Sequence, residues 1–155
     1  LCPFAKSPFV THKIRYVVSE AQSEAELLQD FLAELNTLLQ QPKIETTLLI
    51  HPNILGDFLD YNDFLYLAND VLERAELDGV IQVASFHPNY YFAGTQPNDR
   101  ENYTNRSPYP MLHLLRESSV EMATETYPNI DDIPYKNIET MQQLSEKKFK
   151  VLFKL

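Results

Sequence analysis

Hydrophobic side chains in the first half of the chain follow two alternating patterns. Residues 14–18, 46–50 and 80–86 are short runs of β-branched, aliphatic and aromatic residues, which are typical of strands. Residues 23–41 instead carry apolar side chains every three or four positions, the spacing of an amphipathic helix. Ser23 and Glu26 have capping-box spacing at its start, and Pro42 ends it. The same period predicts a second helix, which Asp60 or Asn62 caps and which ends before Gly79.

Strands that are separated by helices favour parallel pairing. We therefore predict an α/β fold, with a small, mainly parallel sheet flanked by helices. The second half adds a loop over residues 88–106, a helix from Ser107-Pro108 to about Glu125, and a helix over residues 134–145. The tail, residues 147–155, reads as an edge strand or a mobile end. The alternative architecture is an α+β ferredoxin-like sandwich, to which the tail or Tyr91-Phe92 supplies another strand.

Composition narrows the class of protein. The chain has 155 residues, 44% of them hydrophobic, which favours one globular domain over residues 1–155. Since the first residue is Leu1 and not Met, we expect a truncated N-terminal boundary. A net charge of −9 argues against nucleic-acid binding, and no apolar run approaches the roughly 18–20 residues of a membrane helix. The single cysteine, Cys2, suits a reducing, cytoplasmic compartment, and we interpret it as a buried residue near the chain end or as a reactive thiol.

Histidines supply the candidate catalytic groups. His51 and His87 each begin a His-Pro-Asn triplet directly after a predicted strand, so parallel strands would place both at one edge of the sheet, where α/β folds bind ligands. His113 shares a face of the third predicted long helix with Arg116. Imidazoles titrate near neutral pH, which makes these three residues candidates for general acid–base catalysis. The alternative is that His51 and His87 fill buried corners and His113 makes an ordinary surface pair with Glu117.

A metal is the second use of these side chains. Three histidines can hold one divalent ion, with Asp60 as a further oxygen ligand. The candidate ligands are far apart in the sequence, and acidic residues also favour the first turn of a helix. The sequence therefore leaves two possibilities, no cofactor or a single divalent metal.

Residues 105–108, Asn-Arg-Ser-Pro, predict an anion site at a helix start. Free backbone N–H groups would meet the anion there, together with the Arg106 guanidinium and the Ser107 hydroxyl. Arg116 is a further candidate ligand, and Tyr91 and Tyr103 would cover the site from the loop. The alternative is that Arg106 pairs with an acidic residue of the loop, Asp99 or Glu101, and tethers it.

Several segments together carry a family resemblance: Cys2-Pro3-Phe4-Ala5, Asp60-Tyr61-Asn62-x-Phe64, Phe86-His87-Pro88-x-Tyr90, and a long motif from Asn102 to Glu117 that reads NYTNRSPYPxxHxxRE. They resemble a bacterial family of domains of unknown function, number 1415. The resemblance covers nearly the whole chain. It implies a bacterial, cytosolic protein, and it supplies no activity, cofactor or catalytic residues.

Two functions remain open on the sequence. The first is an enzyme or binder of a small anionic molecule that uses His51, His87, His113 and Arg106 at the sheet edge, with or without a metal. The second is a non-catalytic interaction module, in which the aromatic residues of the loop form an exposed face for a protein partner.

Overall fold

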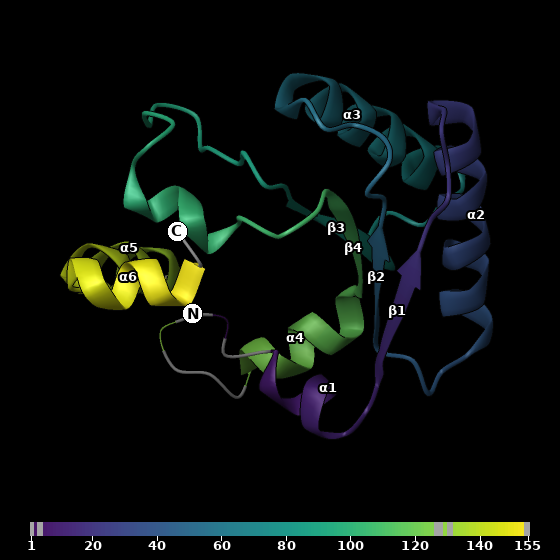
Figure 1. Ribbon diagram of the computed structural model, residues 1–155. Coiled ribbons are helices and arrows are strands. Elements are labelled where there is room, and N and C mark those ends of the chain that lie inside the picture. Colours follow the sequence, from purple (N-terminus) through teal and green to yellow (C-terminus); the bar gives the residue numbers. More distant parts are fainter. Residues whose placement is uncertain (1, 3–4, 126–128, 130–131, 154–155) are drawn as a thin grey trace.

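A four-stranded sheet with helices around it forms the centre of the protein (Figure 1). The computed structural model describes residues 2, 5–125, 129 and 132–153. The strands are β1 (Ile14–Val18), β2 (Thr46–Ile50), β3 (Ile81–Phe86) and β4 (Met111–Arg116). The helices are α1 (Lys6–Val10), α2 (Glu24–Gln40), α3 (Phe58–Arg74), the 3₁₀ helix η1 (Arg100–Thr104), α4 (Glu117–Glu125), α5 (Ile133–Gln143) and α6 (Glu146–Phe153).

The sheet is mixed, with the strand order β1-β2-β4-β3. β1 and β2 pair in parallel, whereas β4 runs antiparallel to both of its neighbours, β2 and β3. The predicted α/β class is confirmed, but the prediction of a mainly parallel sheet is wrong. β1, β2 and β3 do point the same way, as predicted, and β4 is the strand that the prediction missed.

β4 lies where the sequence predicted the start of a long helix. Leu112 and Leu114 are fully buried, and the residues between and beside them are less so, which is the two-residue period of a strand. The helical part of that prediction is confirmed only from Glu117 onward, in α4. Met111, Leu112 and Leu115 fit the period of a helix, whereas Leu112 and Leu114 fit that of a strand, so this short apolar run was ambiguous, and pairing with β2 and β3 decided it.

The two long helices begin at side-chain caps. The Ser23 hydroxyl accepts a hydrogen bond from the backbone N–H of Glu26, as the capping box predicts. The cap of α3 is Asp57, whose carboxylate accepts from the N–H groups of Leu59 and Asp60, so the prediction of Asp60 or Asn62 is wrong. Gly79 does adopt a positive φ of 75°, in the turn that leads into β3.

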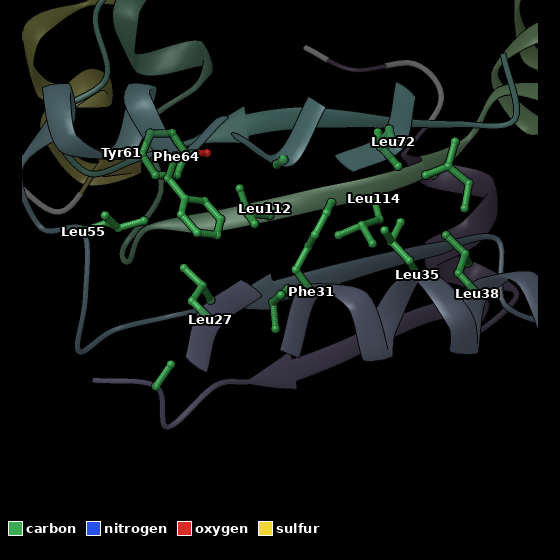
Figure 2. Packing of buried hydrophobic residues seen from close by; sticks show 14 of the residues in the cluster. Leu27, Phe31, Leu35, Leu38, Leu55, Tyr61, Phe64, Leu72, Leu112 and Leu114 are labelled. Carbon is green, nitrogen blue, oxygen red and sulfur yellow. The ribbon is translucent and has the colours of Figure 1, made fainter. Parts of the chain in front are cut away.

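The hydrophobic core lies between one face of the sheet and the helices α2 and α3, which Figure 1 shows on the same side. Figure 2 shows the leucines of α2, Phe31, the aromatic residues of α3 and the inward leucines of β4 meeting in one layer. An ion pair adds to this contact, because the Arg15 guanidinium on β1 donates to the buried Glu34 carboxylate on α2 through two bonds of 2.6 and 3.0 Å.

The remaining predicted elements have mixed outcomes. Helix α5 matches the predicted helix over residues 134–145. Residues 91–93 form no strand, and the tail is helical in α6, with Lys154 and Leu155 outside the described residues. The extra strand of the sandwich alternative is therefore absent from the part of the chain that the structure describes. No helix in that part has the length and apolar character needed to cross a bilayer.

Arg116, a predicted ligand-binding residue, lies at the opposite end of the sheet from the strand ends that carry His51 and His87. Its guanidinium donates to the carbonyl oxygens of Leu38, Gln41 and Ile44. These carbonyls lie at and after the C-terminal end of α2, where a cation is favourable because the last carbonyls of a helix have no partner inside it. Arg116 therefore fastens the end of α2 to the last residue of β4.

Replacing Arg116 with Met should destabilise the fold by about 2 kcal/mol, because three carbonyls lose a charged donor. Urea unfolding measures this as a lower midpoint at an unchanged m-value. Arg74→Met is the matched control. Arg74 is exposed and, among the residues that the structure describes, pairs only with Asp70 on its own helix, so its loss should cost at most about 0.5 kcal/mol. Equal effects of the two substitutions would contradict this role of Arg116.

Candidate functional site

His51 and His87 come together at the end of the sheet, as their positions after two strands predicted. β2 and β3 are separated by β4 but point the same way, so both histidines leave the sheet at one edge. The ring of Tyr61, on α3, bridges them, with ring centroids 5.9 Å from His51 and 5.1 Å from His87. The Tyr61 hydroxyl donates to the carbonyl of Met111 and accepts from the N–H of Phe86, which fixes this ring between β3 and β4.

The hydrogen-bond partners of the ring nitrogens indicate which tautomer each imidazole adopts. The Ile54 carbonyl can only accept, so Nδ1 of His51 carries the proton over 3.1 Å and Nε2 is left as an acceptor. In His87 the backbone N–H of Asn89 donates to Nδ1, so Nε2 carries the proton and donates to the Leu55 carbonyl at 3.0 Å. Because Nδ1 of His87 accepts a hydrogen bond, that ring is neutral, and both imidazoles bind backbone groups of the segments that follow β2 and β3.

Burial keeps this pair neutral and closed to substrate. Both side chains are 0% exposed. Desolvation lowers the pKa of His51, and the nearby His87 lowers it further, because two positive charges would repel. Desolvation lowers the pKa of His87 as well. The arrangement matches the alternative considered from the sequence, in which these histidines fill buried corners, and it gives a substrate no access to either ring.

His113 lies on the other face of the sheet. It belongs to β4 and not to a helix, so its place on a helix was predicted wrongly. Because Leu112 and Leu114 point into the core, the alternation of the strand sends His113 away from it and away from His51 and His87. The hypothesis that three histidines and Arg106 gather at one edge does not describe this structure.

The metal candidates do not assemble either. Asp60 is exposed on the first turn of α3, and His113 is separated from the other histidines by the sheet. Cys2 is exposed too, which corrects the interpretation of Cys2 as a buried residue. Across residues 2, 5–125, 129 and 132–153, no three His, Cys, Asp or Glu side chains lie close enough to hold one ion. The described residues therefore offer no donor set for the single divalent metal considered from the sequence.

Three of the predicted ligand-binding residues do meet in one pocket. Tyr103, Arg106 and Ser107 line a cavity of about 520 Å³, together with Pro88, Pro108 and the α6 residues Leu152 and Phe153. The Arg106 guanidinium lies over the Tyr103 ring, 4.1 Å from its centroid. It also donates from Nε to the carbonyl of Tyr90 and from Nη2 to that of Pro97.

The charge of Arg106 has no carboxylate partner within 4.0 Å among the described residues, and Nη1 makes no hydrogen bond to them. The predicted alternative, a pair with Asp99 or Glu101, is therefore not formed. The predicted helix start at Ser107 is also wrong, because the Ser107 hydroxyl closes a turn by donating to the Tyr109 carbonyl. The anion-binding potential of this segment thus comes from the guanidinium and not from a helix dipole.

The aromatic side chains of the loop over residues 88–106 pack against α3 and α6. Tyr90 and Tyr91 contact the ring of Phe58 on α3, with centroids 5.2 and 4.8 Å away, and Phe92 packs on Tyr90. Tyr103 meets two rings of α6 edge-on. Tyr91 therefore faces α3 and is not among the residues that line the Arg106 pocket. The aromatic side chains of the loop are therefore half-buried and are not among the exposed large hydrophobic residues.

Sequence reasoning missed two organising residues, Asn102 and Tyr61. The buried Asn102 side chain accepts from the N–H of Phe92 and the hydroxyl of Thr95, and donates to the Gln96 carbonyl, so it closes the loop. An asparagine in a segment rich in turn residues is a weak signal of such a role. Tyr61 sits on the buried face of a predicted helix, where a hydroxyl needs a partner, and this was the available signal.

Comparison with known proteins finds a matching family, for which no activity is given. The family model described as "Protein of unknown function (DUF1415)" matches residues 1–151. The searches of curated proteins and of solved structures gave no match.

The buried histidines predict a loss of stability in mild acid. Burial lowers the pKa of His113 to about 4 from an ordinary value of 6.5, and the pKa values of His51 and His87 are lowered too. Since the unfolded chain then binds more protons, stability is complete above about pH 6.5 and falls as pH drops toward 4. Between pH 7 and 5, the free energy of unfolding of His113→Leu should fall by about 1–2 kcal/mol less than that of the unsubstituted chain, as measured by urea unfolding.

The matched control for this prediction is His12→Asn. His12 lies on an exposed turn before β1, outside the buried core, so its replacement provides the comparison. A stability that is flat between pH 7 and 5, or one that responds equally to both substitutions, would contradict the neutral, buried state of these rings.

Proposed function

Because the chain belongs to this family of unknown function, DUF1415, we propose its function from its own geometry: it binds a small organic anion in the pocket around Arg106. One observation carries the proposal. A guanidinium without a carboxylate partner among the described residues is held in a pocket, stacked on Tyr103 and positioned by two carbonyls. Such a positioned donor binds a carboxylate or phosphate more strongly than a mobile surface arginine does, because less side-chain entropy is lost.

The other walls of the pocket indicate the rest of the ligand. Leu152 and Phe153 of α6 and two prolines form an apolar lining, and the Ser107 oxygen remains able to accept a hydrogen bond. A cavity of about 520 Å³ is within the usual range for small-molecule sites. The pocket therefore suits an anion attached to an apolar or aromatic body, such as an aryl carboxylate.

The global charge of the protein does not oppose this ligand. The net charge of −9 argues against nucleic acid, but binding depends on the local potential, and Arg106 makes the pocket positive. The single cysteine of the chain supports a cytoplasmic location, where a free thiol persists. With the histidine pair buried elsewhere, we propose binding and assign no reaction to this pocket.

Benzoate and its uncharged analogue benzamide test the proposal by calorimetry. Benzoate should bind, and benzamide should bind at least tenfold more weakly, because only the carboxylate meets the guanidinium charge. Arg106→Gln should reduce benzoate affinity by tenfold or more. Arg74→Gln, an exposed arginine on α3, should leave it unchanged.

A second variant tests the site without disturbing the loop that Arg106 holds. Leu152 is 62% exposed and lines the pocket, so Leu152→Glu should fold and should repel benzoate. Val151→Glu adds the same charge one residue away, at a position that is 72% exposed and does not line the pocket. Equal affinity in these two variants, or equal binding of benzoate and benzamide, would overturn the assignment.

A further inference from the structure

The strand β1 lies at one edge of the sheet and pairs with β2 alone (Figure 1). Directly after β1, the N–H of Ser19 donates to the carbonyl of Ile50 on β2. Successive residues of a strand point their backbone groups to opposite sides, so the N–H and C=O groups of Ile14, Tyr16 and Val18 point away from the sheet. They make no hydrogen bond to any residue that the structure describes. An unpaired edge of this kind is a template for one more strand.

β1 carries none of the features that usually protect a sheet edge. The strand contains no proline, and it pairs with β2 one residue to one, without a bulge. Its one charged residue, Arg15, is held against α2 by the buried Glu34 carboxylate. Tyr16 and Val18 lie on the opposite face of the strand, and each is 58% exposed. The edge therefore presents free backbone groups together with exposed apolar side chains.

On the α2 side, the same edge borders an acidic groove of about 550 Å³. Val17 and Val18 of β1 line it together with residues of α2 and of the turn between them, and no lysine or arginine is among the lining residues. Its acidic residues are Glu20, Glu26, Asp30 and Glu34. Glu34 pairs with Arg15, whereas the other three carboxylates have no cationic partner within 4.0 Å among the described residues. The groove is therefore complementary to a cationic segment.

The free edge and the groove select the same kind of partner. A strand added beside β1 would alternate its side chains between the two faces of the sheet. On the α2 face they would lie beside the acidic groove, where lysine or arginine is favourable. On the other face they would meet Tyr16 and Val18, where apolar side chains are favourable. A second copy of this chain fits less well, because joining two β1 edges would bring two sets of unpaired carboxylates together.

We propose that the edge of β1 binds an extended segment of a partner protein by strand addition, and that this segment alternates cationic and apolar side chains. The backbone groups of β1 supply the hydrogen bonds, and the acidic groove supplies the specificity for charge. The groove shares no residue with the pocket around Arg106, so this inference is independent of the proposed function.

A fluorescent heptapeptide of alternating lysine and valine tests the proposal, by fluorescence anisotropy with the full chain at about 0.1 M salt. This peptide should bind. The same peptide with glutamate in place of lysine should bind at least about tenfold more weakly, because the groove repels it. A peptide with all its lysines before its valines has the same charge but the wrong period, and it should also bind at least about tenfold more weakly.

Methylation of the peptide backbone separates strand addition from attraction between charges. Methyl groups on alternate amide nitrogens block one edge of an extended peptide and leave its other edge free. One peptide is methylated at its three valines and the other at three of its lysines. One of the two should lose affinity by about tenfold or more, since its hydrogen bonds to β1 are blocked. Which of them it is reports whether the segment adds parallel or antiparallel to β1.

Two protein variants test the edge and the groove separately. Tyr16→Pro removes an N–H that pairs with no described residue, so the sheet should form and peptide affinity should fall by about tenfold or more. Glu20→Gln combined with Asp30→Asn removes two charges from the groove, and should lower the affinity and its dependence on salt, even if the first variant does not fold. The matched control is Asp63→Asn combined with Glu73→Gln, exposed on α3 outside the groove, which should leave the affinity unchanged.

Three results would overturn the proposal. The first is no change in anisotropy with the lysine–valine peptide. The second is equal affinity of the two methylated peptides, which would leave charge alone as the cause of binding. The third is self-association of the unsubstituted chain that Tyr16→Pro abolishes, measured by sedimentation, which would assign the edge to a second copy.

Discussion

The antiparallel insertion of β4 between β2 and β3 is the constraint on which the other features depend. Met111 to Leu115 pair with a strand on both sides, and Arg116 pairs with β3 alone. Because Leu112 and Leu114 are buried against α2 and α3, the alternation of the strand sends Met111 and His113 to the opposite face. The last residue of the same strand, Arg116, then closes the end of α2. The alternating residues of β4 thus contribute to both faces of the sheet, one in the core and the other lining a pocket.

This division separates two kinds of histidine. His51 and His87 end strands on the core side, where Tyr61 and backbone groups enclose them as neutral rings. Burial lowers the pKa of His113 too, but this ring lines a pocket on the opposite face of the sheet. The cationic group is Arg106, and none of the three imidazoles lines its pocket. The proposed anion site therefore uses none of the three imidazoles.

Local pattern predicted the first half of the fold well and the middle of the chain poorly. The strands after Lys13 and Lys43 and the helix from Ser23 were recoverable, because period, caps and turn residues agree there. β4 was missed because its apolar run fits both periods, and only pairing with strands far away in sequence selects the extended form. Arg106, Ser107 and Tyr103 were predicted to form one anion site at a helix start; they do line one pocket, but no helix begins there. The separation of His113 from His51 could not be predicted, since it follows from the strand that was missed.

The most direct test of this account is the ¹⁵N NMR spectrum of the histidine side chains at neutral pH. Long-range couplings report which ring nitrogen carries the proton. The account predicts a neutral Nδ1–H tautomer for His51 and neutral Nε2–H tautomers for His87 and His113. The His113 proton lies on Nε2 because the Thr46 hydroxyl donates to the Leu114 carbonyl and must accept from the ring. The account also predicts that His113, whose pKa burial lowers to about 4, gains no proton between pH 7 and 6. A His113 ring that averages between tautomers, or titrates near pH 6.5 as a solvated histidine does, would contradict it.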